Sequence, residues 1–399
     1  MWFVAVFPFS ALPHSAPAQP VYLDNAATTP LDPAVFEAMT PFLRDFFGNP
    51  SSTHSHGRQV RAAVEQARKA VANLLNAAPG EITFTSGGTE ADNRAIISTA
   101  RSLGIRHAIS TGLEHHAVLH SLETLAHAGE IELHRVRHDE RGRVDLNHLE
   151  ELLRANPRAL VSLMHANNEV GTLLPLAAVG ALCRQHHAIF HSDTVQTMGH
   201  YRHDARTLGA HFLVGSAHKF HGPKGIGFLF TDSSVQVAPL IQGGAQERGQ
   251  RGGTENVAGI IGLAKALEIA YAEMADHQRH IQRLKDRMIA HLRTALGDDV
   301  RFNGTSELAD ESLYTVLNVS LPPSEMTKML LFNLDIHKIS ASGGSACTSG
   351  SNIGSHVLAA LGCDPSRGAV RFSFSKYTTA EEVDYAAGVL TGLYQRVAA

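Results

Sequence analysis

Short apolar runs alternate with amphipathic segments between residues 81 and 230 of this chain. Seven runs rich in β-branched and aromatic residues are predicted to be strands: EITFTS, RHAIST, IELHRV, ALVSLMH, AIFHSD, HFLVGS and GIGFLF. Between them, segments such as 89–104 and 174–187 repeat their apolar residues every three to four positions, which predicts helices. This alternation is typical of an α/β fold with a mainly parallel sheet buried between helices.

The pattern changes after about residue 254. Residues 254–296 predict two helices or one long kinked helix. Beyond them come a strand-like run, SLYTVLNVSL, a Ser/Gly-rich loop, a second strand-like run, GAVRFSFS, and a final helix that opens at TTAEEVDYAAGVL. We therefore expect a domain boundary near residue 276, with a smaller α+β domain after it.

Composition and charge narrow the class of protein. The chain has 399 residues, 44% of them hydrophobic, and a formal charge of −4 from 34 basic and 38 acidic residues. Because the charges are interspersed and nearly balanced, we expect no direct nucleic-acid partner and no membrane partner. Residues 1–20 are apolar and Pro/Ala-rich but lack the positive start of a secretory signal. An irregular extension of a cytoplasmic protein is therefore favoured over secretion.

The three cysteines have different surroundings in the sequence. Cys183, Cys347 and Cys363 cannot all pair and form no CxxC, which disfavours a disulfide scaffold and a zinc knuckle and fits a reducing compartment. Cys183 falls in an apolar helical pattern and Cys363 ends another, so both are expected to be structural. Cys347 lies in residues 340–355, where ten of sixteen are Ser or Gly, so little apolar surface is present to fix this thiol in place.

Polar residues follow five of the predicted strands. Ligands of open α/β sheets bind beyond the carboxyl ends of the strands, so these positions are candidates for a site. They are Gly88 and Thr89 at a helix start, His115, Asn168, Asp193 and Gln196, and Ser216, His218 and Lys219. The five strand ends carry amide, carboxylate, hydroxyl, imidazole and amine groups. This variety of functional groups is greater than the general polarity of loops explains.

This combination points to pyridoxal phosphate. Proteins hold that cofactor with a lysine that forms an imine, an acid beside the ring nitrogen and a helix start that binds phosphate, as Lys219, Asp193 and SGGTE could provide. Each feature alone has a plainer interpretation: a surface amine, a loop carboxylate or an N-cap. GPKGIG resembles a dinucleotide loop, but it lies between two predicted strands, which disfavours a nicotinamide-dependent dehydrogenase.

The 25 histidines raise the question of a metal site. Pairs such as His115/His116 and His186/His187 are adjacent, so their side chains diverge on a helix or strand. No HExxH or comparable ligand spacing is present. We therefore expect no metal site, and most of the histidines to lie at the surface.

Ten ordered motifs resemble the pyridoxal-phosphate-dependent cysteine desulfurases. They are YLDNAATTP, FGNPSSTHSHGR, FTSGGTEADN, EHHAVL, MHANNEVGT, HSDTVQ, SAHKFHGPKGIG, ERGQRGGTENV, GSACTSG and VRFSFS, and they cover residues 21 to about 395. Within that family the chain is similar to the group that supplies sulfur for iron–sulfur clusters and tRNA thiolation. The resemblance implies the aspartate aminotransferase-like, PLP-dependent transferase fold of the class V aminotransferases. Residues 32–276 would form the large domain, and 21–31 with 277–399 the small domain.

The resemblance also implies how the cofactor is held. Lys219 would bind it covalently, Asp193 would pair with its ring nitrogen, and His115 would stack on the ring and act in acid/base steps. Gly88, Thr89, Ser216 and His218 would hold chiefly its phosphate, joined by Thr254 from the second subunit of a homodimer. Asn168 and Gln196 would contact its phenolic side.

The implied reaction converts L-cysteine to L-alanine. Arg371, with Asn168, would bind the substrate, since a guanidinium pairs with a carboxylate in bidentate fashion. Cys347 would be the nucleophile and would carry the sulfur as a persulfide. The sulfur acceptor would be a protein such as an iron–sulfur scaffold or a tRNA-thiolation sulfurtransferase, and the sequence does not choose between them.

Alternatives and departures from the family remain. A selenocysteine lyase or another class V aminotransferase would use the same cofactor, and a non-catalytic sulfur-transfer scaffold would keep only the fold. The family usually reads Ser-Ser-Gly-Ser-Ala-Cys, whereas Gly343 stands here for the second serine, which adds flexibility and removes no reacting group. Residues 1–20 have no counterpart in the family.

Overall fold

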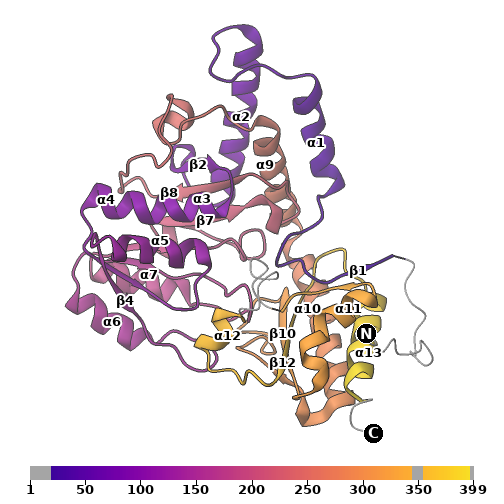
Figure 1. Cartoon of the computed structure of the whole chain (residues 1–399). Helices are drawn as coiled ribbons and strands as arrows, with labels where there is room; N and C mark the ends of the chain where they lie inside the picture. Colours follow the sequence, from indigo (N-terminus) through magenta and orange to yellow (C-terminus); the bar gives the residue numbers. More distant parts are fainter. Residues whose placement is uncertain (1–18, 344–353, 396–399) are drawn as a thin grey trace, which may run out of the picture.

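The structure is a computed structural model that describes residues 19–343 and 354–395 (Figure 1). Its largest sheet has seven strands in the order β2-β8-β7-β6-β5-β3-β4. The strands are β2 (Ile82–Thr85), β3 (His107–Ser110), β4 (Glu132–Arg135), β5 (Leu160–Ser162), β6 (Ile189–Ser192), β7 (Phe212–Ser216) and β8 (Gly227–Thr231). Each coincides with one of the seven runs predicted from the sequence, except that β8 extends one residue beyond its run, and this confirms the α/β fold.

All strands of this sheet except β8 run in one direction. The pairs β3–β4, β3–β5, β5–β6 and β6–β7 are parallel. β8 is antiparallel to both β7 and β2, so β2 points the same way as β7. The carboxyl ends of β2, β3, β5, β6 and β7 therefore meet at one edge, where the predicted polar residues begin.

Helices cover both faces of the sheet. One face presents Ile109, Val161 and Phe190 to a core shared with α2 (Ser55–Leu74), α6 (Leu146–Ala155), α7 (Leu176–Gln185) and α9 (Val257–Ala272). The other presents Ala108 and Leu160 to α4 (Thr99–Leu103) and α5 (His116–His127). Because successive strand residues point to opposite faces, both must be apolar, which explains the unbroken apolar runs.

The helix predicted for residues 89–104 is divided into three parts. α3 (Gly88–Asn93) leads into a π-helical turn (Arg94–Ser98) and then into α4. The run ends at Gly104, whose φ of 62° is left-handed and suits a residue without a side chain. Its start faces the carboxyl-end edge of the sheet, and this orients its free backbone N–H groups toward the candidate site.

A second group of strands and helices has its own core (Figure 1). β10 (Val316–Leu321) pairs antiparallel with β12 (Gly368–Ser373) and β9 (Arg301–Phe302), and β1 (Val21–Tyr22) pairs parallel with β11 (Ile339–Ser340). The helices that contribute to this core are α10 (Met274–Leu296), α11 (Leu330–Ile336) and α13 (Ala380–Gln395). The short α12 (His356–Ala360) instead packs through Val357 against Leu113 and Val170. Two separate cores support the predicted domain division, whose boundaries stay a prediction.

The helices that had no counterpart in the sequence prediction are α1 (Pro33–Arg44), α2, the short α8 (Ala205–Leu208), α11 and α12. α1 begins at Asp32, whose side chain caps Ala34 N–H, and it contributes Val35 and Met39 to the large core. Its opposite side exposes Phe36 and Leu43. Among the described helices, none is long and apolar enough to cross a membrane.

Buried histidines should make the fold sensitive to acid. The expectation that most histidines lie at the surface is wrong, because most of those described are buried or half-buried. Burial lowers the pKa of His200, His203 and His221 to about 4. Since these groups titrate near pH 6.5 in the unfolded chain, that state binds more protons between about pH 6.5 and 4, and stability falls as the pH falls. Buried carboxyls with a raised pKa, such as Glu114 at about 8, oppose this, but they are fewer.

We therefore expect the urea midpoint of unfolding to fall between about pH 7 and pH 5. His203→Gln should flatten this dependence, because it removes a group that the folded state keeps neutral. His127→Gln, at an exposed position, is the matched control and should leave the dependence unchanged. A midpoint that does not move with pH in the unsubstituted protein would contradict the prediction.

Candidate active site

A cavity of about 250 Å³ lies at the carboxyl-end edge of the seven-stranded sheet. Ten of the twelve predicted site residues line it: Gly88, Thr89, His115, Asn168, Asp193, Gln196, Ser216, His218, Lys219 and Arg371. Thr254 is exposed in the loop between β8 and α9 and does not line this cavity. Cys347 lies outside the described residues. The structure therefore brings the strand-end residues together, while their roles stay predictions.

Lys219 faces a wall formed by the N-terminal segment. It ends the 3₁₀ turn Ala217–Lys219, directly after β7. Its Nζ donates hydrogen bonds to the carbonyl oxygens of Ala26 and Ala27, at 2.5 and 2.9 Å. Gln196 Nε2 donates to the same Ala26 oxygen at 3.0 Å. Sequence reasoning noted the motif YLDNAATTP but assigned none of its residues to the site.

Asp193 and His115 provide an acid and an imidazole on neighbouring loops. Asp193 follows β6 and is buried, and its Oδ1 accepts the N–H of Val195 at 2.9 Å. Burial raises the pKa of Asp193, while positive charge on His115 and Lys219 acts in the opposite direction. His115 caps α5, and its Nδ1 accepts the N–H of Ala117 at 3.1 Å. The neutral ring therefore carries its proton on Nε2, and burial lowers the pKa of His115.

A second buried acid lies close to Asp193 and was missed by sequence reasoning. Asp92 of α3 lines the cavity, and its Oδ1 is 3.2 Å from Nε2 of His191. His191 Nδ1 in turn contacts Ser162 Oγ at 2.8 Å. Burial, with the charge of Asp193, raises the pKa of Asp92 well above its usual range. Within a helical pattern, Asp92 looked like an ordinary polar position.

One end of the cavity is suited to an anion. Gly88 begins α3, and a Cβ there would lie 2.7 Å from Cγ2 of Val195, so a larger residue would clash. A second hollow of about 410 Å³ shares Gly88, Thr89, Ser216 and His218 with the cavity. Burial lowers the pKa of His218 to about 4, and the positive charges of Lys219 and Lys224 act in the same direction. Backbone N–H groups at a helix start, with two hydroxyls beside them, are donors that bind phosphate.

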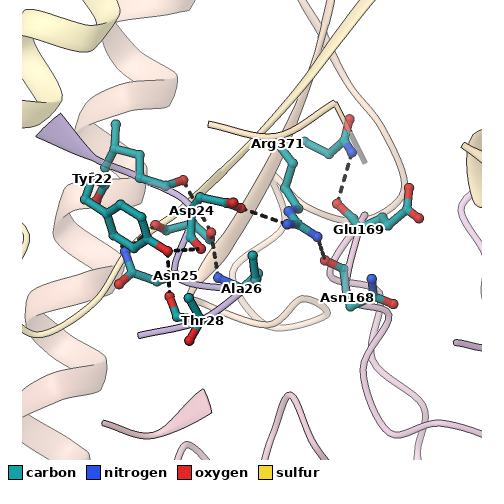
Figure 2. A network of polar contacts seen from close by, with 12 residues as sticks. Tyr22, Asp24, Asn25, Ala26, Thr28, Asn168, Glu169 and Arg371 are labelled. Atoms are coloured by element: carbon teal, nitrogen blue, oxygen red, sulfur yellow. Dashed lines mark hydrogen bonds and ion pairs between the residues drawn. The ribbon is translucent and has the colours of Figure 1, made fainter. Parts of the chain in front are cut away.

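Arg371 of β12 lines the cavity, and Figure 2 shows its guanidinium group between Asp24 and Asn168. The side chain is buried, with Nη1 donating to the carbonyl oxygen of Asn168 at 2.8 Å and Nη2 to Asp24 Oδ1 at 2.9 Å. Its Nε has no hydrogen-bond partner among the described residues. Tyr22 Oη donates to the carbonyl oxygen of Thr28 at 2.8 Å and so braces the loop that carries Asp24. A guanidinium has five N–H donors, so Arg371 is held in place and still has donors for an anion.

The residues that flank segment 344–353 form hydrogen bonds with residues at the cavity. Ser342 exchanges two main-chain hydrogen bonds with Arg371, at 3.2 and 2.6 Å. Ser355 Oγ donates to Oε2 of Glu169, the residue after Asn168. The chain thus leaves and re-enters the described structure next to cavity-lining residues.

Of the two described cysteines, Cys183 is a core residue as predicted, and the structural role of Cys363 stays a prediction. Cys183 of α7 is buried in the large core, and burial raises the pKa of its thiol to about 12. Cys363 is half-buried, with its Sγ 3.6 Å from Oδ1 of Asn303, and burial also raises the pKa of its thiol. Neither lines the cavity.

Comparisons with known proteins agree with this geometry. Residues 21–386 match the class V aminotransferase family. A cysteine desulfurase IscS of Dictyoglomus turgidum is 42% identical over 381 residues, covering 94% of this chain and 95% of its own length. Cysteine desulfurase 2 of Trichormus variabilis is 42% identical over 383 residues, covering 95% of this chain and 94% of its own. The solved structure of a NifS-like protein superimposes with a TM-score of 0.87 at 36% identity, covering 95% of this chain and 100% of the other. The chain belongs to the class V aminotransferase family and, within it, to the cysteine desulfurases.

Proposed function

We propose that the chain converts L-cysteine to L-alanine with pyridoxal phosphate and keeps the sulfur as a persulfide on Cys347. One observation carries the proposal: a single cavity combines Lys219, Asp193 and His115 with Arg371. The chain on either side of the Cys347 segment is also bonded beside this cavity. The similarity to cysteine desulfurases supports the same reaction.

The residues of the cavity fit pyridoxal phosphate. Lys219 offers an amine, and Asp193 is a buried carboxylate whose raised pKa a cationic ring nitrogen would lower. The start of α3 with Thr89 and Ser216 suits the phosphate, and Gly88 provides the space. Asn168 and Gln196 line the same cavity, where they would meet the phenolic side. When bound, the cofactor supplies an electron sink that stabilises negative charge on the α-carbon of an amino acid.

Arg371 orients the substrate. Two of its N–H groups donate to Asp24 and to the Asn168 carbonyl oxygen, which fixes the orientation of the guanidinium group. Its remaining N–H groups bind the cysteine carboxylate. His115 acts through Nε2–H, because its Nδ1 already accepts the cap of α5. A neutral His115 is therefore a hydrogen-bond donor in the cavity. To act as a base through Nε2, the ring would have to carry its proton on Nδ1, and the hydrogen bond from Ala117 N–H that caps α5 would be lost. This favours the substrate sulfur, entering as a thiolate, as the group that takes the Cys347 proton.

Cys347 accepts the sulfur. Its thiolate attacks the substrate sulfur, and the S–S bond forms as the Cβ–S bond of the substrate breaks. The electron pair of that bond stays on carbon, which takes up a proton to give alanine. Cys347 is five residues beyond Ser342, and five extended residues span at most about 18 Å, so the chain length permits this contact.

Product analysis separates this reaction from its alternatives. Holoenzyme with L-cysteine and a thiol reductant should give alanine and sulfide in equal amounts without a keto acid. An aminotransferase would require the keto acid, and a non-catalytic scaffold would form neither product. A strong preference for selenocysteine over cysteine would instead indicate a selenocysteine lyase.

The enzyme acts as a homodimer that passes its sulfur to another protein. Exposed apolar residues on and after α1, Phe36, Leu43 and Phe47, support contact with a second copy. Met329, Leu331 and Phe332 expose apolar surface on and next to α11, and Leu331 lies beside Gly343, the last residue described before Cys347. This surface suits a protein acceptor such as an iron–sulfur scaffold or a tRNA-thiolation sulfurtransferase. Free cysteines and a persulfide fit the reducing cytoplasm.

Thr254 would complete the phosphate site of the partner subunit. We expect Thr254→Ala to weaken cofactor binding by about 10- to 100-fold, since a hydrogen bond to a charged group contributes roughly 1.5–3 kcal/mol. Titration of the apoenzyme with pyridoxal phosphate measures this affinity, and sedimentation measures the dimer. Thr124→Ala is the control, because Thr124 is exposed on α5 and lies outside the cavity. Equal affinities in Thr254→Ala and Thr124→Ala would contradict the role.

A further inference from the structure

His107, Glu132 and His134 form a cluster on β3 and β4, apart from the active-site cavity. His107 Nδ1 lies 3.2 Å from His134 Nε2 and 3.7 Å from Glu132 Oε2. His134 Nε2 lies 4.0 Å from Glu132 Oε1. One ligand atom from each residue lies within 4.8 Å of the other two. None of the three residues lines the active-site cavity.

The sheet itself brings these side chains together. His107 is directly opposite Glu132 in the parallel pairing of β3 with β4, and Ile109 is opposite His134. Alternate residues of a strand share a face, so His107, Glu132 and His134 all lie on one face. Because the ladder fixes the backbone of both strands, the three side chains start from neighbouring positions before any ligand arrives. The residues are 25 and 27 positions apart in sequence, which is why a search for helical ligand spacings found no metal site.

The spacing of the ligand atoms suits a tetrahedral metal ion. Zinc binds imidazole nitrogen at about 2.0–2.1 Å and carboxylate oxygen at about 2.0–2.2 Å, which separates neighbouring ligands by roughly 3.4 Å. The two imidazole nitrogens are 3.2 Å apart, close to that value. The Glu132 carboxylate approaches His107 with Oε2 at 3.7 Å and His134 with Oε1 at 4.0 Å, so a small rotation of this exposed side chain would bring one oxygen to both nitrogens. Two imidazoles and one carboxylate with an open fourth position are also a known zinc ligand set. Imidazole ligands favour zinc and similar metals over magnesium and calcium.

We propose that His107, Glu132 and His134 bind one Zn²⁺ ion per chain. The side chains of the three residues are 33%, 70% and 17% exposed, so solvent ions can enter without unfolding. Without metal, the imidazole contact requires one ring to donate its proton and the other to accept. Zinc replaces that shared proton, which is released to solvent, and the Glu132 carboxylate lowers the charge of the ion. The ion would also join the edge strand β4 to β3.

The alternative is a simple histidine–histidine hydrogen bond, and metal counting distinguishes the two. The test uses cofactor-loaded full chain carrying Cys347→Ser, because a free thiol is itself a zinc ligand. Equilibrium dialysis against Zn²⁺ in excess Mg²⁺ is followed by measurement of bound zinc per chain. His134→Gln and Glu132→Gln remove one ligand each, and His127→Gln, an exposed histidine outside the cluster, is the control.

We expect His134→Gln and Glu132→Gln each to lose one equivalent of zinc, while His127→Gln keeps it. Zinc should raise the melting temperature of the parent and of the control, and not of the two cluster variants. Circular dichroism checks folding; if His134→Gln unfolds, the exposed Glu132→Gln gives the same comparison. Equal zinc content in the parent and Glu132→Gln would overturn the proposal, and so would complete displacement of the ion by Mg²⁺.

Discussion

Replacing Cys347 by serine should abolish alanine formation from cysteine while leaving the absorption of the bound cofactor unchanged. The proposed step needs a thiolate that attacks the substrate sulfur, and an ordinary thiol with a pKa of about 8.5 supplies a few per cent of it at neutral pH. A serine hydroxyl is not ionised there and forms no persulfide. We expect activity to fall on the order of 1000-fold or more, the range seen when a nucleophile is removed.

Cys363→Ser is the matched control for this change. Cys363 is half-buried, contacts Asn303 and lies outside the cavity, so its replacement should leave activity nearly intact. Steady-state alanine formation and the cofactor spectrum are measured for both variants. Full activity in Cys347→Ser, or loss of activity in Cys363→Ser alone, would show that Cys347 is not the nucleophile.

Arg371→Lys should raise the KM for cysteine by about 10- to 100-fold, with a smaller change in kcat. Lysine keeps the positive charge but loses the two parallel N–H groups that match a carboxylate, a difference of roughly 1.5–3 kcal/mol. The substitution also leaves the Asn168 carbonyl or Asp24 without a donor. Initial rates over a range of cysteine concentrations separate KM from kcat.

Two further variants test whether the change in KM comes from the carboxylate contact of Arg371. Asp24→Asn keeps the shape of the group that holds the guanidinium but removes its charge, so we expect a smaller rise in KM. Arg367→Lys is the control, since Arg367 bonds Ser320 and the Asp299 carbonyl away from the cavity. A KM that is unchanged in Arg371→Lys, or raised equally in Arg367→Lys, would exclude Arg371 as the carboxylate site.

Much of the fold followed from local sequence patterns. Six of the seven strands of the large sheet are almost fully buried, so each is a nearly unbroken apolar run that stands out from its neighbours. The edge strand β4 is the exception, because its residues are exposed or only half-buried. The polar residues after these runs were found for the same reason, since a parallel sheet collects strand ends at one edge. α1 and α2 lie before the first strand of that sheet, outside the alternating pattern, and were not predicted.

What the sequence did not reveal depends on contacts between distant residues. Ala26 and Ala27 meet Lys219 through backbone carbonyls almost two hundred positions away, and no side-chain pattern announces such a contact. Asp24 acquires its importance only when β12 brings Arg371 beside it. Asp92 looked like any polar helical residue until the fold buried it near Asp193. The candidate site residues could thus be predicted from the sequence, whereas the residues that hold them in place were found only in the structure.

The sulfur on the enzyme itself can be observed directly. Holoenzyme is incubated with L-cysteine without a reductant, and its intact mass and peptides are then measured by mass spectrometry. We expect the mass of one added sulfur atom per chain, carried by the peptide that contains Cys347 and absent from Cys347→Ser. Added sulfur on Cys363 alone, or alanine formation with no sulfur bound at Cys347 at any time, would contradict the proposed function.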